Sequence, residues 1–94
     1  MQFLVEIDIA LPAMDPAERE ELFTAERARG EELRAAGSIQ RIWRVADRPA
    51  NVGIWRARDA ADLDGLLRSL PFYPYVTTRV APLEPHLLDP GDDE

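Results

Sequence analysis

Residues 1–18, MQFLVEIDIALPAMDPAE, contain a strand pattern that gives way to a helix pattern. Apolar residues occupy every second position from Phe3 to Ile9, and these residues are β-branched or aromatic. A period of two predicts a β-strand with one buried face, and Pro12 marks its end. The chain therefore opens with a strand that leads directly into a helix.

A long helix is expected after this strand. Asp15 precedes Pro16 and stands three residues before Glu18, which is the residue pattern of a capped helix start. Glycine commonly follows the last turn of a helix. We therefore expect the helix to run from Pro16 to about Ala36 and to stop at Gly37.

The rest of the chain predicts two adjacent strands, a shorter helix and a last strand. The adjacent strands are expected at residues 38–46 and 50–57, and the last strand at 75–83. Asp59 is expected to cap the second helix and Pro71 to end it. Leucines at i, i+3, i+4 and i+7 form its apolar stripe: Leu63, Leu66, Leu67 and Leu70.

The order β-α-β-β-α-β predicts a ferredoxin-like α+β fold, with a single antiparallel sheet and both helices on one face. A chain of 94 residues buries a modest core. We therefore expect the sheet of a second subunit to cover the other face.

The composition argues against several kinds of partner. The chain has no cysteine and a net charge of −7, which disfavours disulfides, thiolate chemistry, nucleic acid and anionic membranes. No apolar run reaches the roughly 20 residues of a membrane span, and the N-terminus lacks the basic region of a signal peptide. We expect a cytoplasmic protein with one domain over residues 1–82 and an acidic C-terminal tail over residues 83–94.

A carboxylate stands where the first helix should present a core residue. Leu22 and Leu33 mark the apolar stripe of this helix, and Glu26 and Gly30 occupy the positions between them. An acid beside a residue without a side chain suggests the floor of a pocket, where desolvation would raise the pKa of Glu26 and suit it to proton transfer. The alternative is a slightly rotated helix that buries Phe23 and leaves Glu26 at the boundary with solvent.

Other catalytic patterns are weak. His86 is the one histidine of the sequence and lies in the tail, which argues against a histidine-based metal site or a serine–histidine pair. Trp43 and Trp55 suit a core or a stacking surface. The 11 basic residues are all arginine, and an arginine that faces a cavity from a strand would suit a ligand carboxylate.

The chain resembles the muconolactone Δ-isomerase family over nearly its whole length. The resemblance rests on the following segments and their spacing: MQFLVEIDIALP at 1–12, MDPAE at 14–18, Glu26 in the middle of the first helix, IWRVADRPAN at 42–51 and LPFYPY at 70–75. The last segment is the most distinctive. Within it, Pro74 is expected to keep Tyr73 extended, so that Phe72 and Tyr73 pack at a cleft mouth or a subunit contact.

The resemblance implies a cofactor-free and metal-free enzyme of aromatic-compound degradation, in the β-ketoadipate pathway. Such an enzyme moves the ring double bond of an anionic unsaturated lactone, from muconolactone to the 3-oxoadipate enol-lactone, by a 1,3-proton shift. The resemblance also implies a homo-oligomer of the dimeric α/β-barrel type, in the family often a decamer, and a C-terminal tail that packs on a neighbouring subunit.

Residue roles follow from the matching positions. Glu26 is the expected base, Arg44 is expected to hold the carboxylate of the substrate, and Asn51 is expected to donate to the enolate oxygen. The alternatives are an interstrand ion pair for Arg44 and a turn position for Asn51.

Two departures from the family bear on the substrate. The family has a lysine where Glu6 stands, inside the expected cleft, and a His-Tyr pair where this chain has Arg48 and Pro49. Arg48 is expected to replace the histidine as a ligand of the substrate carboxylate. The alternatives to the main interpretation are a divergent isomerase or cyclase for another enolisable intermediate, a cofactorless oxygenase, and a non-catalytic ligand-binding subunit.

Overall fold

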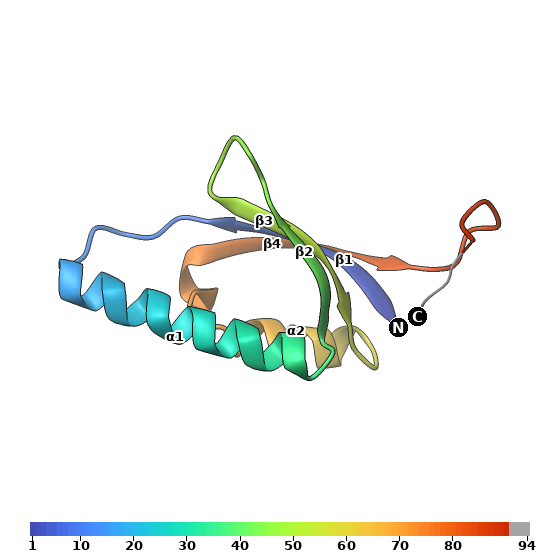
Figure 1. The fold of residues 1–94 in the computed structure, drawn as a ribbon, viewed down its shortest axis with the longest axis horizontal. Helices are drawn as coiled ribbons and strands as arrows, with labels where there is room; N and C mark the ends of the chain where they lie inside the picture. Colours follow the sequence, from blue (N-terminus) through green and yellow to red (C-terminus); the bar gives the residue numbers. More distant parts are fainter. Residues whose placement is uncertain (91–94) are drawn as a thin grey trace.

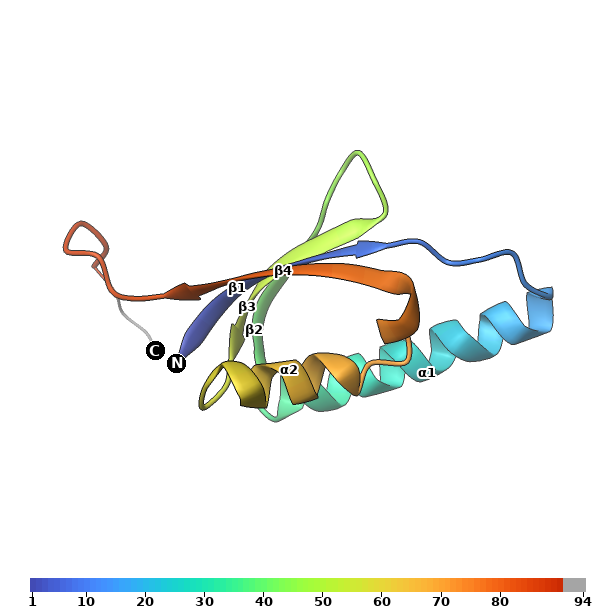
Figure 2. The same cartoon turned by 180° about the vertical axis from the view of Figure 1, so that it is seen from behind.

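The computed structural model describes residues 1–90, and its elements follow the predicted order. They are β1 (Gln2–Ile9), α1 (Pro16–Ala35), β2 (Ile39–Arg44), β3 (Ala50–Arg56), α2 (Ala60–Arg68), the 3₁₀ turn η1 (Tyr73–Tyr75) and β4 (Val76–Leu83). The strands pair antiparallel in the order β2-β3-β1-β4. Both helices cover the same face of the sheet (Figure 1, Figure 2). The predicted ferredoxin-like α+β fold is confirmed.

α1 begins and ends where the sequence indicates. At its start, the Asp15 carboxylate accepts the N–H of Ala17 at 3.2 Å, and the Glu18 carboxylate accepts the N–H of Asp15 at 3.3 Å. Just after its end, Gly37 adopts a φ of 86°, a left-handed conformation that a residue with a side chain rarely takes. The length of α1 is therefore set by local sequence.

The segment between α2 and β4 departs from the prediction, and the expectation of an extended Tyr73 is wrong. Residues 73–75 form a 3₁₀ turn in which the N–H of Tyr75 donates to the carbonyl of Phe72 at 2.8 Å. Pro74 fits this turn because the N–H groups of a first helical turn have no acceptor within the helix. The turn leaves Phe72 buried beneath the sheet.

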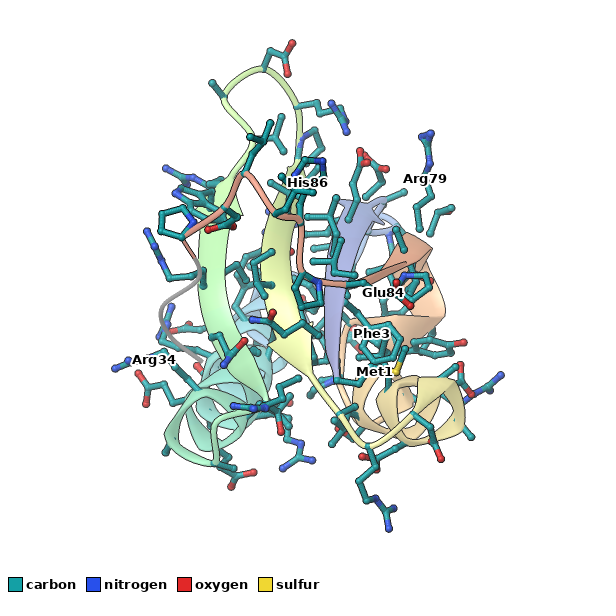
Figure 3. The ribbon with its side chains drawn as sticks, turned by 90° about the vertical axis from the view of Figure 1, so that its right-hand side faces the viewer. Met1, Phe3, Arg34, Arg79, Glu84 and His86 are labelled. Carbon is teal, nitrogen blue, oxygen red and sulfur yellow. The ribbon has the colours of Figure 1, made fainter. Side chains whose placement is uncertain are left out.

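Alternate residues of each strand point to opposite faces, which we call the helix side and the open side. On β1, Phe3, Val5 and Ile7 are buried on the helix side, where they pack with Trp55 and the leucines of α2. The open side carries Leu4, Glu6 and Asp8 from β1 and Arg79 from β4, and Figure 3 shows Arg79 pointing away from the helices. The hairpin between β2 and β3 also projects toward the open side (Figure 1).

Close approach of β2 to β3 requires a glycine in the middle of β3. A Cβ atom on Gly53 would lie 2.3 Å from the carbonyl oxygen of Arg41, nearer than any normal contact. The β2–β3 ladder also shifts register between Ile39 and Arg41. This irregularity sets which residues of β2 face the helices.

Beyond β4 the chain leaves the domain as an arm (Figure 1). Leu87 and Leu88 in this arm are 93% and 80% exposed. The acidic residues 92–94 of the predicted tail lie outside the described residues. Neither helix in the part of the chain that the structure describes combines the length and apolar character needed to cross a membrane.

Candidate active site

A cavity of about 730 Å³ lies on the helix side, at the end of the sheet where β1 and β2 finish and β3 begins. Its volume lies within the range of small-molecule pockets. α1 supplies one wall and the strand ends supply the other. The apolar part of the lining includes Ile9, Leu11, Phe23, Ile42, Pro49 and Phe72. A largely apolar cavity of this size suits a small organic ligand.

Arg44 and Asn51 form the polar part of the sheet wall. They are directly opposite each other in the β2–β3 ladder, so their side chains leave the sheet on the same face. Oδ1 of Asn51 is buried without a hydrogen-bond partner within residues 1–90. Arg44 has no ion pair with any carboxylate of the same residues. Arg44 therefore makes no interstrand ion pair within the described residues, and Asn51 is a strand residue of β3 and not a turn residue.

Glu26 lies one turn beyond Phe23 on α1 and is half-buried. Its Oε1 accepts the N–H of Phe72 at 2.8 Å. Burial raises the pKa of Glu26 above its ordinary value, and the N–H of Phe72 offsets part of that rise. The sequence-based expectation of a partly buried acid with a raised pKa is therefore confirmed.

The helix wall of the cavity lies closer to the start of α1 than the sequence suggests. Its lining residues on α1 are Arg19 and Phe23, and Glu26 adjoins the cavity through Phe72 without lining it. The rings of Phe23 and Phe72 meet edge to face, with centroids 5.2 Å apart. Gly30 has open space around it and is not part of the cavity, so the expectation of a pocket floor there is wrong.

Arg48 and Glu6 lie away from the cavity, contrary to the expected cleft. Arg48 bonds the carboxylate of Glu6, and its Nε donates to Asp8 at 2.8 Å. The bond to Asp8 raises the pKa of Arg48. Alternation along β1 puts both acids on the open side, whereas the cavity lies on the helix side.

Arg19 is the cavity residue that sequence reasoning missed. Its Cζ lies 4.8 Å from the centroid of the Phe23 ring, and both side chains line the cavity. The i, i+4 spacing of an arginine and an aromatic residue is the signal that could have indicated the pair.

The fold and the cavity together define a class of protein. The chain is a small ferredoxin-like domain with a largely apolar pocket whose polar lining consists of two arginines and an asparagine. No cluster of three or more histidine, cysteine, aspartate or glutamate side chains in the described residues could hold a metal ion.

Comparison with known proteins identifies the family within this class. Residues 1–89 match the model of the family described as muconolactone delta-isomerase. The chain is 34% identical over 85 residues to Muconolactone Delta-isomerase of Rhodococcus opacus, covering 89% of this chain and 91% of that protein. It is 30% identical to Muconolactone Delta-isomerase of Acinetobacter baylyi over 95 residues, covering 100% of this chain and 99% of that protein.

A solved structure agrees with these relatives. The crystal structure of a muconolactone isomerase superposes with a TM-score of 0.90 at 29% identity, covering 100% of this chain and 99% of that chain. The chain therefore belongs to the muconolactone Δ-isomerase family, and the family indicated by the sequence segments is confirmed.

Proposed function

We propose that the protein is an isomerase that moves the ring double bond of an unsaturated lactone by a 1,3-proton shift, of the type that converts muconolactone to the 3-oxoadipate enol-lactone. The single observation that carries the proposal is membership of the family over residues 1–89. The cavity supports it, because the reaction needs a base, donors to a developing enolate and a cation for the carboxylate of the substrate.

Glu26 is the base in this proposal. Its raised pKa makes the ionised form a stronger base than an exposed glutamate. The N–H of Phe72 donates to Oε1 of Glu26. Oε2 is therefore left to remove a proton from one carbon of the lactone ring and to return it to the allylic carbon. Glu26 does not line the cavity, so its carboxylate must move closer to a bound ligand, and catalytic contacts commonly tighten only when a substrate binds.

Arg44 and Asn51 bind and polarise the substrate. The planar guanidinium of Arg44 can form two parallel bonds to a carboxylate, which fixes the lactone in one orientation. When the base removes the proton, negative charge develops on the lactone carbonyl oxygen. The amide nitrogen of Asn51 can donate to that oxygen, because within the described residues the nitrogen has no hydrogen-bond partner and, unlike Oδ1, is not fully buried.

Arg48 has a structural role in this proposal. Its guanidinium already bonds two carboxylates on the open side, Glu6 and Asp8, and this supports a role in fixing the β2–β3 hairpin against β1. Arg48, at the position where the resemblance implies a histidine, is thus part of an ion-pair cluster.

Self-association is part of the proposal. The open side exposes 39% of Leu4 and 47% of Trp43, and packing it against the open side of a second copy would bury both. The exposed Leu87 and Leu88 are suited to pack on a neighbouring subunit. A decamer, the absence of a cofactor and a cytoplasmic location stay predictions.

The test is a direct ultraviolet assay of the purified protein with muconolactone and no added cofactor. Loss of muconolactone with formation of the enol-lactone is the expected result. Binding without turnover would favour a non-catalytic ligand-binding subunit. Turnover of a different enolisable acid would favour a divergent isomerase or cyclase, and oxygen uptake would favour a cofactorless oxygenase.

A further inference from the structure

The cavity holds cations on two opposite walls. Arg44 projects from the end of β2, on the sheet wall, and Arg19 projects from the first turns of α1, on the helix wall. The lining includes no aspartate or glutamate. This local excess of positive charge stands within a chain whose net charge is −7.

Arg19 has no carboxylate partner among the residues that the structure describes. The acid at the preceding i−4 position, Asp15, uses its carboxylate to cap α1 through the N–H of Ala17. Several other arginines pair with nearby acids within residues 1–90, among them Arg29, Arg48, Arg58 and Arg68. The Arg19 guanidinium instead lies over the Phe23 ring, within the cavity wall.

Helix stability does not account for an arginine at this place. Arg19 is the fourth residue of α1, near the helix end that carries partial positive charge, where a cation is unfavourable. The Phe23 ring restricts the guanidinium to the cavity and so lowers the entropy lost when it binds a ligand. Both features indicate that Arg19 is placed to contact a ligand in the cavity and not to stabilise the helix.

We infer that Arg19 and Arg44 bind two separate acidic groups of one ligand, so that the cavity selects an organic dianion over a monoanion. This rests on the proposed function for the lactone class of substrate, and it adds that the preferred lactone carries a second acidic group. The apolar lining between the two arginines contacts the carbon skeleton. A monoanion would satisfy one guanidinium and leave the other without a partner.

The inference is tested by binding, with adipate and hexanoate as probes that share a six-carbon chain and differ in one carboxylate. Isothermal titration of the wild-type protein at neutral pH and low salt should give a Kd for adipate at least about tenfold lower than for hexanoate, since a charge-assisted bond is worth this factor or more. Arg19→Gln should remove this preference by weakening adipate alone, and Arg19→Lys should retain part of it.

Arg34→Gln is the matched control. Arg34 is an exposed arginine in the last turn of the same helix (Figure 3), and its loss changes the net charge equally, so both affinities should stay at their wild-type values. Equal wild-type affinities, a preference that survives in Arg19→Gln, or no adipate binding at millimolar concentration would overturn the inference.

The two proposals fail in different ways. The titrations need no turnover, so a missing adipate preference in a protein that isomerises muconolactone would overturn the dianion site and leave the isomerase. An Arg19-dependent adipate preference in a protein without lactone turnover would overturn the isomerase and leave the dianion site.

Discussion

Each side of the sheet carries one arginine of the β2–β3 hairpin, and the two arginines differ in whether they have acidic partners. On the open side, Arg48 is bonded to the carboxylates of Glu6 and Asp8. On the helix side, Arg44 faces an apolar cavity and has no acidic partner in the described part of the chain. An arginine that is already paired contributes to the fold, whereas one left unpaired beside a cavity is available to a ligand.

The helix side also holds the acid of the proposed mechanism. Glu26 is half-buried under Phe72, and burial raises its pKa. The acids Glu6 and Asp8 of the open side instead share ion pairs with Arg48. The proposed site and the proposed subunit contact therefore lie on opposite sides of one sheet, and each of the following substitutions tests this difference.

Glu26→Gln is expected to cause the largest loss. Glutamine keeps the size of the side chain and can still accept the N–H of Phe72, but it cannot take up a proton. We expect kcat for muconolactone to fall by about 10²–10⁴-fold, the usual contribution of a general base, in the ultraviolet assay. Glu31→Gln, at an exposed glutamate of the same helix, should keep the wild-type kcat. An unchanged kcat in Glu26→Gln would mean that another group is the base.

Arg44→Gln and Arg48→Gln compare the two sides directly. Loss of the Arg44 guanidinium should lower kcat/KM by about 10–100-fold, because a bond to a charged ligand group is lost. Arg48→Gln should leave kcat/KM within about twofold of wild type, because its exposed ion pairs contribute little. If Arg48→Gln is as damaging as Arg44→Gln, Arg48 binds substrate as the family resemblance implies.

Leu4→Glu tests the assembly side. In a two-fold symmetric contact between open sides, the substitution adds one negative charge from each subunit to the interface. It also removes apolar contact area. We expect the dimer dissociation constant, measured by sedimentation velocity, to rise by about tenfold or more. Ala61→Glu on the exposed face of α2 is the control and should not change association. An unaltered dimer in Leu4→Glu would place the contact elsewhere.

The smallest expected effect is on pH dependence and thermal stability. Because burial raises the pKa of Glu26 above 4.5, kcat/KM should fall as pH decreases through that raised pKa. A raised pKa in the folded protein means that the ionised form costs stability at neutral pH. Glu26→Gln should therefore have a slightly higher Tm than wild type at neutral pH, and the difference should shrink as pH falls through the raised pKa. A Tm difference that grows on acidification would contradict a desolvated Glu26.

The fold could be predicted because its signals are local. The alternation in β1, the Asp15 cap, the Gly37 stop and the leucine stripe of α2 each lie within a few residues, and each is found as expected. The 3₁₀ turn at residues 73–75 was missed, because Pro74 is compatible with both a turn and an extended segment.

The site was only partly predictable, because it depends on contacts between distant segments. The periodicity of α1 found the half-buried Glu26, but its partner Phe72 lies 46 residues away. The cavity wall at Arg19 and Phe23 depends on where α1 crosses the strand ends, and local pattern does not encode that crossing. For the same reason, local pattern did not show which of the two tryptophans is buried. Trp55 lies in the core, whereas Trp43 is 47% exposed.

The proposed function places ligand binding on the helix side, at the end of the sheet that forms the cavity. A crystal structure with a saturated lactone acid, which has no double bond to move, tests it most directly. We expect the ligand in the cavity, with a carboxylate bonded to Arg44 and a ring carbon within reach of the Glu26 carboxylate. A ligand bound on the open side against Arg48, with the cavity unoccupied, would contradict it.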